Sequence, residues 1–475
     1  MIYINIFFYI FLMLLLIVYY CVPIRYRWYA LLVGSIGFYY LFSGGLRWLF
    51  AITVVISWIM GQVIYRYRNK GVLILSVVMV ILPLLVTKHG GSFWRLFAGN
   101  GTLSLIAPLG ISFYTLQIIS YLVDIYRQKI EPQNNLLRYA LYVSFFPQIV
   151  QGPIPRYEKL GTQLYTGHRF EERTFMKGVH LIIWGFFLKL MIADKAAVIV
   201  NAIYGNFRDY KGFYVLIAGI LYSIQLYTDF QACVCIAKGA AGLFGIELED
   251  NFRHPYASTS IKEFWQRWHI SLSSWLRDYI YIPLGGNRKG RLRKYINISI
   301  TFAVSGAWHG SGIKYVFWGM MHAVYQIMGE LLEPITSKLY QLMRIQEGSF
   351  CWRAMKTAGT CFWVMIAWIV FRADGLLMGI RMIMNMVTSF NPWILFDDSL
   401  LALGLAWKEW MVLLISVAIL LAVDFIQNKI CIRDWILRQH LIIRWGIYLT
   451  AILSIWVFGT YGFGFAAQDF IYGGF

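Results

Sequence analysis

The sequence predicts an all-α protein that crosses a membrane many times, with about eleven to thirteen membrane helices, some of them re-entrant. Of its 475 residues, 59% are hydrophobic and only 14% are charged. A soluble protein carries about 25% charged residues, so lipid must cover much of this surface. Several uncharged stretches approach or exceed the roughly 17–25 residues that cross a hydrocarbon core. They are 1–24, 48–65, 71–87, 212–228, 295–313 and 445–467.

The first apolar stretch has the length of a secretory signal without its other features. No basic residue precedes the apolar run and no small-residue cleavage site follows it. We therefore expect residues 1–20 to be retained as a membrane helix.

The net charge of +19 lies mostly in loops, where positive charge marks the cytoplasmic side of a membrane protein. Alternate loops carry Arg25 and Arg27, then Arg66, Arg68 and Lys70, then Arg127 and Lys129. The loops between them carry Arg47 alone, and Lys88 with Arg95. This asymmetry predicts a multi-pass protein of the cell membrane with an extracytoplasmic N-terminus. Because topology explains the charge, nucleic-acid binding is not expected.

A proline-rich segment follows at 130–175. Its run 146–153 is too apolar for a free loop and too broken for a spanning helix. One interpretation is a re-entrant segment lining a cavity, since broken backbone at membrane depth needs protein or water around it. The alternative is a surface hairpin resting on the membrane.

Residues 261–279 read as one amphipathic helix, with apolar side chains at three- and four-residue spacing. Three tryptophans on its apolar stripe suit a membrane interface. Glu263 and Arg267 are spaced for an ion pair. His269 lies at the edge of the stripe, where it can face a cavity.

A basic cluster follows the turn at 283–287. It consists of Arg288, Lys289, Arg291, Arg293 and Lys294. We favour a cytoplasmic anchor, and the alternative is attraction of the phosphates of an acyl carrier. One cluster can serve both roles.

His309 lies inside the uncharged stretch 295–313. An ionisable group at membrane depth is costly and indicates a functional site. Imidazole takes and returns a proton at neutral pH, as transfer of an acyl group to a hydroxyl requires. Gly306, Gly310 and Gly312 leave space for a substrate or for close helix packing. The alternative for His309 is a structural hydrogen-bonding role.

The remaining candidates are weaker. No cysteine pair has CxxC spacing and most of the six cysteines lie in apolar runs, so we expect packed thiols and no metal site. His322, four residues after Trp318, is expected to be a core residue. His254 lies in a turn, where it can contact a ligand.

Several blocks of the sequence resemble the membrane-bound O-acyltransferases, in particular the bacterial branch that includes alginate O-acetyltransferase. The blocks keep their order from about residue 100 to 325. They are PLGISF at 108–113, FPQIVQGPIPR at 146–156, NFRHPY at 251–256, EFWQRWHISLS at 263–273, RDYIYIPLGGNR at 277–288 and WHG at 308–310. The resemblance implies one acyltransferase domain over 1–475 with its motif core at 100–325.

The resemblance also implies roles for residues. His309 corresponds to the family's essential histidine and His269 to its supporting histidine. A central tunnel would admit an acyl donor from the cytoplasm and an acceptor from the other side, with the basic cluster at the donor mouth. The donor would be acetyl-CoA or another acyl thioester, including an acyl carrier protein, with no tightly bound cofactor.

The C-terminal residues 470–475 are similar to the FxYxxF ending of bacterial members. Tyr472 would relay the acyl group to an extracytoplasmic acyltransferase, or the aromatic tail would simply anchor at the interface. Gly473 and Gly474 depart from the bulkier residues common there. A second departure is Cys235, which replaces an acid after Asp229; Asp229 itself is expected to pack or pair locally.

The predicted function is therefore transfer of an acyl group, most simply acetyl, from a cytoplasmic thioester to an extracytoplasmic or cell-wall polysaccharide. One alternative is D-alanyl transfer from a carrier protein to teichoic acid. The alternative outside enzymes is a transporter or flippase, although the region 251–310 has no second copy as paired halves would require.

Overall fold

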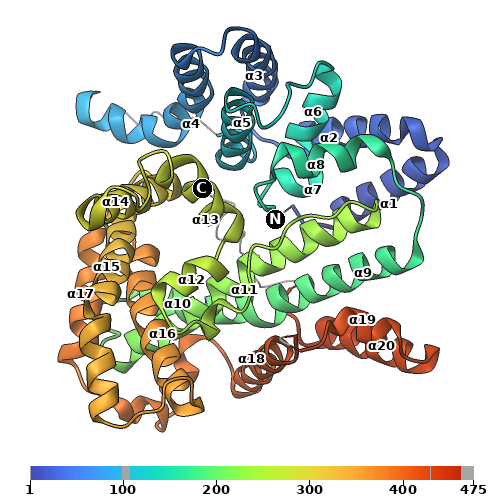
Figure 1. Cartoon of the computed structure of the whole chain (residues 1–475). Helices are drawn as coiled ribbons and strands as arrows, with labels where there is room; N and C mark the ends of the chain where they lie inside the picture. Colours follow the sequence, from blue (N-terminus) through green and yellow to red (C-terminus); the bar gives the residue numbers. More distant parts are fainter. Residues whose placement is uncertain (1, 99–106, 428, 462–475) are drawn as a thin grey trace. The chain divides into compact units, whose positions relative to one another are not determined.

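The computed structural model describes residues 2–98, 107–427 and 429–461 (Figure 1). The described residues form helices joined by turns and loops, and none of them lies in a strand. The prediction of an all-α protein is therefore confirmed.

Within the described residues, some helices are long and apolar enough to cross a membrane. They are α3 (Arg47–Tyr67), α4 (Lys70–Ala98), α11 (Phe213–Leu243), α16 (Phe350–Arg372), α18 (Trp407–Gln427) and α20 (Leu441–Phe458). The shorter apolar helices are α1 (Ile6–Cys21), α5 (Ile111–Tyr126) and α17 (Leu376–Thr388). These helices confirm a polytopic membrane protein, while the count of eleven to thirteen stays a prediction. The stretch 295–313 falls instead in α14 (Gly290–His309) and its following turn, and α14 begins with charged residues.

Contacts between residues divide the chain into two compact units. One holds the described part of Met1–Gly185 and Cys233–Asp250, and the other holds Phe186–Ala232 and the described part of Asn251–Gln468. Helix α11 begins in the second unit and ends in the first. Each unit has its own buried side chains.

The run 146–153 of the proline-rich segment is almost entirely buried in the first unit. Its single helical turn α7 (Phe146–Ile149) is fully buried, and Gln151 is only 1% exposed. Gln148 donates to the side chain of Gln117 at 3.2 Å, and the Tyr3 hydroxyl donates to the Pro147 carbonyl at 2.9 Å. The Tyr3 hydroxyl thus satisfies a backbone carbonyl of this broken run, and the Ser35 hydroxyl accepts from the Phe146 N–H at 3.2 Å, as burial requires. The surface hairpin is wrong, and the lining of a cavity by this segment stays a prediction.

In the second unit, α14 and α15 (Ile313–Leu342) lie side by side (Figure 1). A Cβ added at Gly306 would lie 2.1 Å from the carbonyl oxygen of Tyr315. A Cβ at Gly319 would lie 2.2 Å from the carbonyl oxygen of Phe302. These glycines let the two backbones touch, so Gly306 serves close helix packing.

A buried ion cluster, formed by Lys189, Asp194 and Asp229, also lies in the second unit. Lys189 is in the π-helix η2 (Phe187–Ala193) and its Nζ lies 2.9 Å from Asp194 and 2.7 Å from Asp229. All three side chains are buried. Asp229 pairs locally, as expected for an acid in a membrane protein. Its partner Lys189, and Asp194, which pairs with the same lysine, were not singled out from the sequence.

The prediction of packed thiols holds for only part of the set. Cys233 and Cys235 are buried, whereas Cys21, Cys351 and Cys431 are exposed. An apolar neighbourhood in a membrane protein indicates either the core or the lipid-facing surface, so it does not decide burial.

Candidate active site

His309 is the last residue of α14 and is 2% exposed. Its ring centroid lies 5.2 Å from that of Trp318 on α15 and 5.5 Å from that of Phe371 on α16. The preceding residue, Trp308, lies 4.8 Å away. Side chains from three consecutive helices therefore enclose this imidazole.

His269 lies at a break in the chain. Helix α12 (Ile261–Arg267) ends before it and α13 (Ile270–Leu276) begins after it, followed by the π-helix η4 (Arg277–Tyr281). His269 has φ +45° and ψ +53°, in the left-handed region. The continuous helix over 261–279 is therefore wrong. Apolar periodicity persists across a single left-handed residue, and histidine is among the residues that adopt this conformation more often.

The structure brings the two predicted histidines to the same tryptophan. The His269 ring lies 6.1 Å from the Trp308 ring, and His309 contacts that ring as well. His269 is 1% exposed and also packs on Phe230 of α11, at 4.8 Å. Both histidines thus belong to one buried aromatic region of the second unit.

The tryptophans of the α12–α13 segment are not at an interface. Trp265, Trp268 and Trp275 are 9%, 1% and 5% exposed. Trp268 stacks on Phe264 at 5.4 Å and contacts Trp368 at 5.2 Å. The expected membrane-interface role is wrong, because these rings pack inside the protein. The predicted ion pair between Glu263 and Arg267 is present at 2.5 Å.

His322 is a core residue, as predicted, and it also lies close to His309. It is fully buried, and its ring lies 5.1 Å from Trp318, which in turn contacts His309. Its Nδ1 accepts a hydrogen bond of 3.3 Å from Nε1 of Trp265. The sequence analysis missed this neighbourhood, although the spacing of Trp318 and His322 puts both on one face of a helix. We call His309, Trp318, His322, Trp368 and Phe371 the aromatic histidine cluster.

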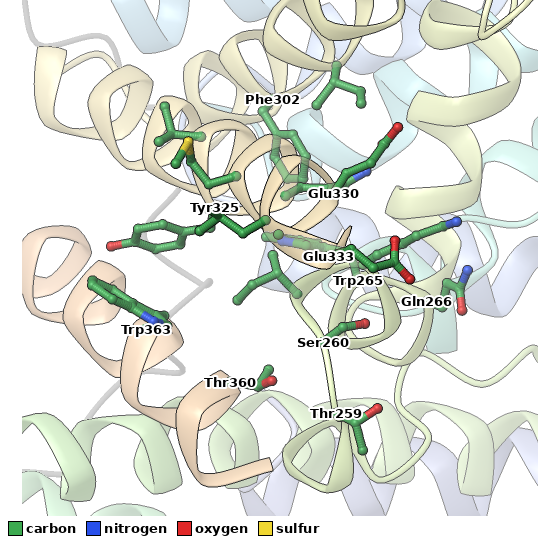
Figure 2. A pocket seen from close by; sticks show the side chains of 18 of the residues that line it. Thr259, Ser260, Trp265, Gln266, Phe302, Tyr325, Glu330, Glu333, Thr360 and Trp363 are labelled. Carbon is green, nitrogen blue, oxygen red and sulfur yellow. The ribbon is translucent and has the colours of Figure 1, made fainter. Parts of the chain in front are cut away.

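A large cavity of 1540 Å³ lies in the second unit, between α12, α13, α14, α15 and α16 (Figure 2). Its lining includes the charged side chains of Lys262, Arg277, Lys294, Glu330 and Glu333. It also includes the aromatic side chains of Trp265, Phe302, Tyr325 and Trp363. The cavity can therefore hold a large ligand with both anionic and apolar parts.

Two packed rings, those of His322 and Trp318, lie between the cavity wall and His309. His322 contacts the wall residues Trp265 and Phe302, with ring centroids at 5.0 and 6.1 Å. Trp318 contacts both His322 and His309. Phe302 precedes His309 by seven residues on α14, about 10 Å along the helix axis. Neither His269 nor His309 lines the cavity itself.

The basic cluster only partly lines this cavity. Lys294 belongs to the lining and its Nζ lies 2.5 Å from Glu330. Arg288, Lys289, Arg291 and Arg293 are not among the lining residues. Lys262 and Arg277, which sequence reasoning did not single out, supply the other cations named above.

Of two further candidates, the structure describes His254 but not Tyr472. His254 has its Nδ1 3.2 Å from a carboxylate oxygen of Asp424, so its contact within the protein is with an acid. Tyr472 and the rest of the 470–475 ending lie outside the described residues.

The model of the membrane-bound O-acyltransferase family matches residues 128–371, which include His269, His309 and the whole cavity lining. The chain belongs to this family and is an acyltransferase. It is similar to "Probable alginate O-acetylase AlgI" of Pseudomonas syringae pv. tomato, with 32% identity over 90% of this chain and 82% of that protein.

Two other relatives have different printed activities. "Peptidoglycan O-acetyltransferase" of Helicobacter pylori is 32% identical over 60% of this chain and 58% of that protein. "Teichoic acid D-alanyltransferase" of Bacillus subtilis is 28% identical over 66% of this chain and 83% of that protein. These comparisons confirm the resemblance found in the sequence and favour an enzyme over a transporter or flippase.

Proposed function

We propose that this protein takes an acetyl group from a cytoplasmic thioester and delivers it to hydroxyl groups of a polysaccharide outside the cytoplasm. The observation that carries the proposal is His309, buried at the end of α14 and joined through two rings to a large cavity with cationic side chains. The acetyl group is preferred over D-alanyl because the relatives named as acetylases match more of the chain or at higher identity.

The cavity suits the donor. Lys262, Arg277 and Lys294 can bind the phosphates of acetyl-CoA through charge-assisted hydrogen bonds. The aromatic wall suits the less polar arm that carries the thioester. An acyl carrier protein, which presents the same kind of arm, is the alternative donor.

His309 would act as the general base. The acceptor hydroxyl oxygen bonds to the thioester carbonyl carbon while His309 takes the hydroxyl proton. The carbon–sulfur bond then breaks, and the leaving thiolate receives that proton from His309. His269, which shares the Trp308 contact with His309, would orient the donor.

The aromatic C-terminal residues 470–475 would transfer the acetyl group to the acceptor outside the cytoplasm. The Tyr472 phenol can accept the acetyl group as an ester and pass it to an extracytoplasmic acyltransferase or directly to the polysaccharide, since a phenyl ester is a reactive acyl donor. Tyr472→Phe should then abolish acetylation outside the cell, whereas normal acetylation would leave the tail with an anchoring role. The extracytoplasmic N-terminus belongs to the same proposal.

The test of the function compares polysaccharides from the producing cell with and without this protein by mass spectrometry. Acetyl esters should disappear on deletion and return with the wild-type chain or with His440→Ala, a change at an exposed histidine. His309→Ala should not restore them. Loss of D-alanyl esters instead of acetyl esters on deletion would show that the transferred group is D-alanyl and not acetyl. Full restoration by His309→Ala would contradict the proposed mechanism.

A further inference from the structure

Three nitrogen atoms in the aromatic histidine cluster are buried without a hydrogen-bond partner among the described residues. They are Nε1 of Trp318, Nε1 of Trp368 and Nε2 of His322. All three side chains are 0% exposed. More than about 90% of buried polar groups in proteins have a partner, so such an atom needs an explanation.

The three nitrogens belong to rings that touch one another. Trp318 stacks on Trp368 with ring centroids 5.5 Å apart. His322 lies 5.1 Å from Trp318 and 6.0 Å from Trp368. One ligand atom in this neighbourhood can therefore satisfy more than one of them.

All three nitrogens act as donors. The indole N–H of tryptophan can only donate. Nδ1 of His322 accepts from Trp265, so its neutral ring carries its hydrogen on Nε2. Several donors without an acceptor favour an electron-rich oxygen, such as a carbonyl oxygen that gains negative charge.

The position of these donors matches the proposed reaction. Trp318 contacts His309, and His322 contacts the cavity wall at Trp265 and Phe302. The donors thus lie on the rings that connect the donor cavity to the general base. The acyl carbonyl has to reach this region when His309 takes the acceptor's proton.

We infer that the N–H groups of Trp318, Trp368 and His322 bind the carbonyl oxygen of the acyl donor and stabilise the oxyanion formed during transfer, an inference that rests on the proposed function. As the acceptor oxygen bonds to the carbonyl carbon, the π electron pair moves onto the carbonyl oxygen and the proton passes to His309. The pair then returns, the carbon–sulfur bond breaks, and the thiolate takes the proton. A buried site strengthens such hydrogen bonds because water does not compete for the oxygen.

The sharpest test exchanges one N–H without changing the shape of the ring. Trp318 is replaced by 3-benzothienylalanine, in which sulfur stands where the indole carries N–H. Purified protein in lipid nanodiscs is given an oligosaccharide acceptor and assayed for release of CoA thiol from acetyl-CoA. We expect kcat to fall about 100-fold, with KM changed by less than about threefold, because the lost bond forms chiefly in the transition state.

Two controls separate this effect from general damage. The same replacement at Trp410, another buried indole without a described acceptor, should leave kcat within about twofold of wild type. An unreactive thioether, S-ethyl-CoA, lacks the carbonyl oxygen and should bind the wild type and the Trp318 variant equally. If the Trp318 variant does not fold, the same replacement is made at Trp368, and its kcat tests the inference instead.

The possible results differ clearly. A kcat within about threefold of wild type, or an equal loss at Trp410, would overturn the inference. An active wild type and an inactive His309→Ala together with an unaffected Trp318 variant would overturn this inference alone. A wild-type protein that releases no thiol would overturn the proposed function, and the inference with it.

Discussion

Lys189 in the ion cluster lies between two carboxylates, whereas the N–H groups of Trp318 and Trp368 in the aromatic histidine cluster have no described acceptor. Both clusters are buried in the second unit, and both contain groups that are costly to bury. In the first, the protein supplies the partners itself. In the second, a substrate can supply them.

This difference helps to separate structural from catalytic polar groups. A π-helix and buried charges each suggest a functional site, and η2 with Lys189 combines the two. Yet its charges are paired within hydrogen-bonding distance, as in a cluster that holds helices together. Removal of a paired group should therefore cost stability, and removal of an unpaired group should cost activity.

The largest stability effect is expected at Lys189. Lys189→Met leaves Asp194 and Asp229 buried without their cation, which should destabilise the protein by about 3–5 kcal/mol. Thermal unfolding followed by size-exclusion chromatography in detergent would measure the loss.

A matched triple variant tests the cause of this effect. Lys189→Met combined with Asp194→Asn and Asp229→Asn removes all three charges and should recover much of the stability. If Lys189→Met alone unfolds at the wild-type temperature, the ion cluster does not hold this part of the fold.

A moderate loss of stability is expected at the pair α14 and α15, which carries His309, Trp318 and His322 of the aromatic histidine cluster. In Gly306→Ala, the new methyl group meets the Tyr315 carbonyl oxygen and forces α14 away from α15, at a cost of about 1–3 kcal/mol. His309 would then move from Trp318, so acyl transfer should fall too. Gly446→Ala on α20 is the control, since its Cβ enters open space and the residue does not line the cavity. Equal stability and activity of the two variants would contradict the close packing.

The smallest stability effect is expected at Trp318. Replacement by 3-benzothienylalanine removes an N–H that has no acceptor among the described residues, so the free energy of unfolding should change by less than about 0.5 kcal/mol. The same thermal assay measures it. A loss as large as that of Lys189→Met would show that this N–H has a structural partner, and the contrast between the clusters would disappear.

Much of the fold was predictable because its signals are local. Uncharged stretches located four of the long apolar helices, and motif blocks located both histidines. The helix break at His269 was not predictable from apolar periodicity, because one left-handed residue changes the chain direction without changing the pattern of apolar residues. The burial of Trp265 and Trp268 was missed because lipid and protein core favour the same side chains.

The features that the sequence did not predict depend on contacts between residues far apart in the chain. Lys189 and Asp229 are forty residues apart, and neither the charge pattern nor a motif pairs them. His322 was correctly placed in the core, but its link to His309 runs through Trp318 and requires α14 to fold back on α15. The cations Lys262 and Arg277 meet Lys294 only at the three-dimensional cavity.

The central claim is that His309 takes the acceptor's proton during acyl transfer, and radiolabelled acetyl-CoA tests it most directly. Purified wild type and His309→Ala, matched for thermal stability, are given the donor and an oligosaccharide acceptor, and alkali-labile label on the acceptor is counted. We expect the variant to lose at least about 100-fold in rate, as for removal of a general base. Transfer by His309→Ala at the wild-type rate would contradict the account.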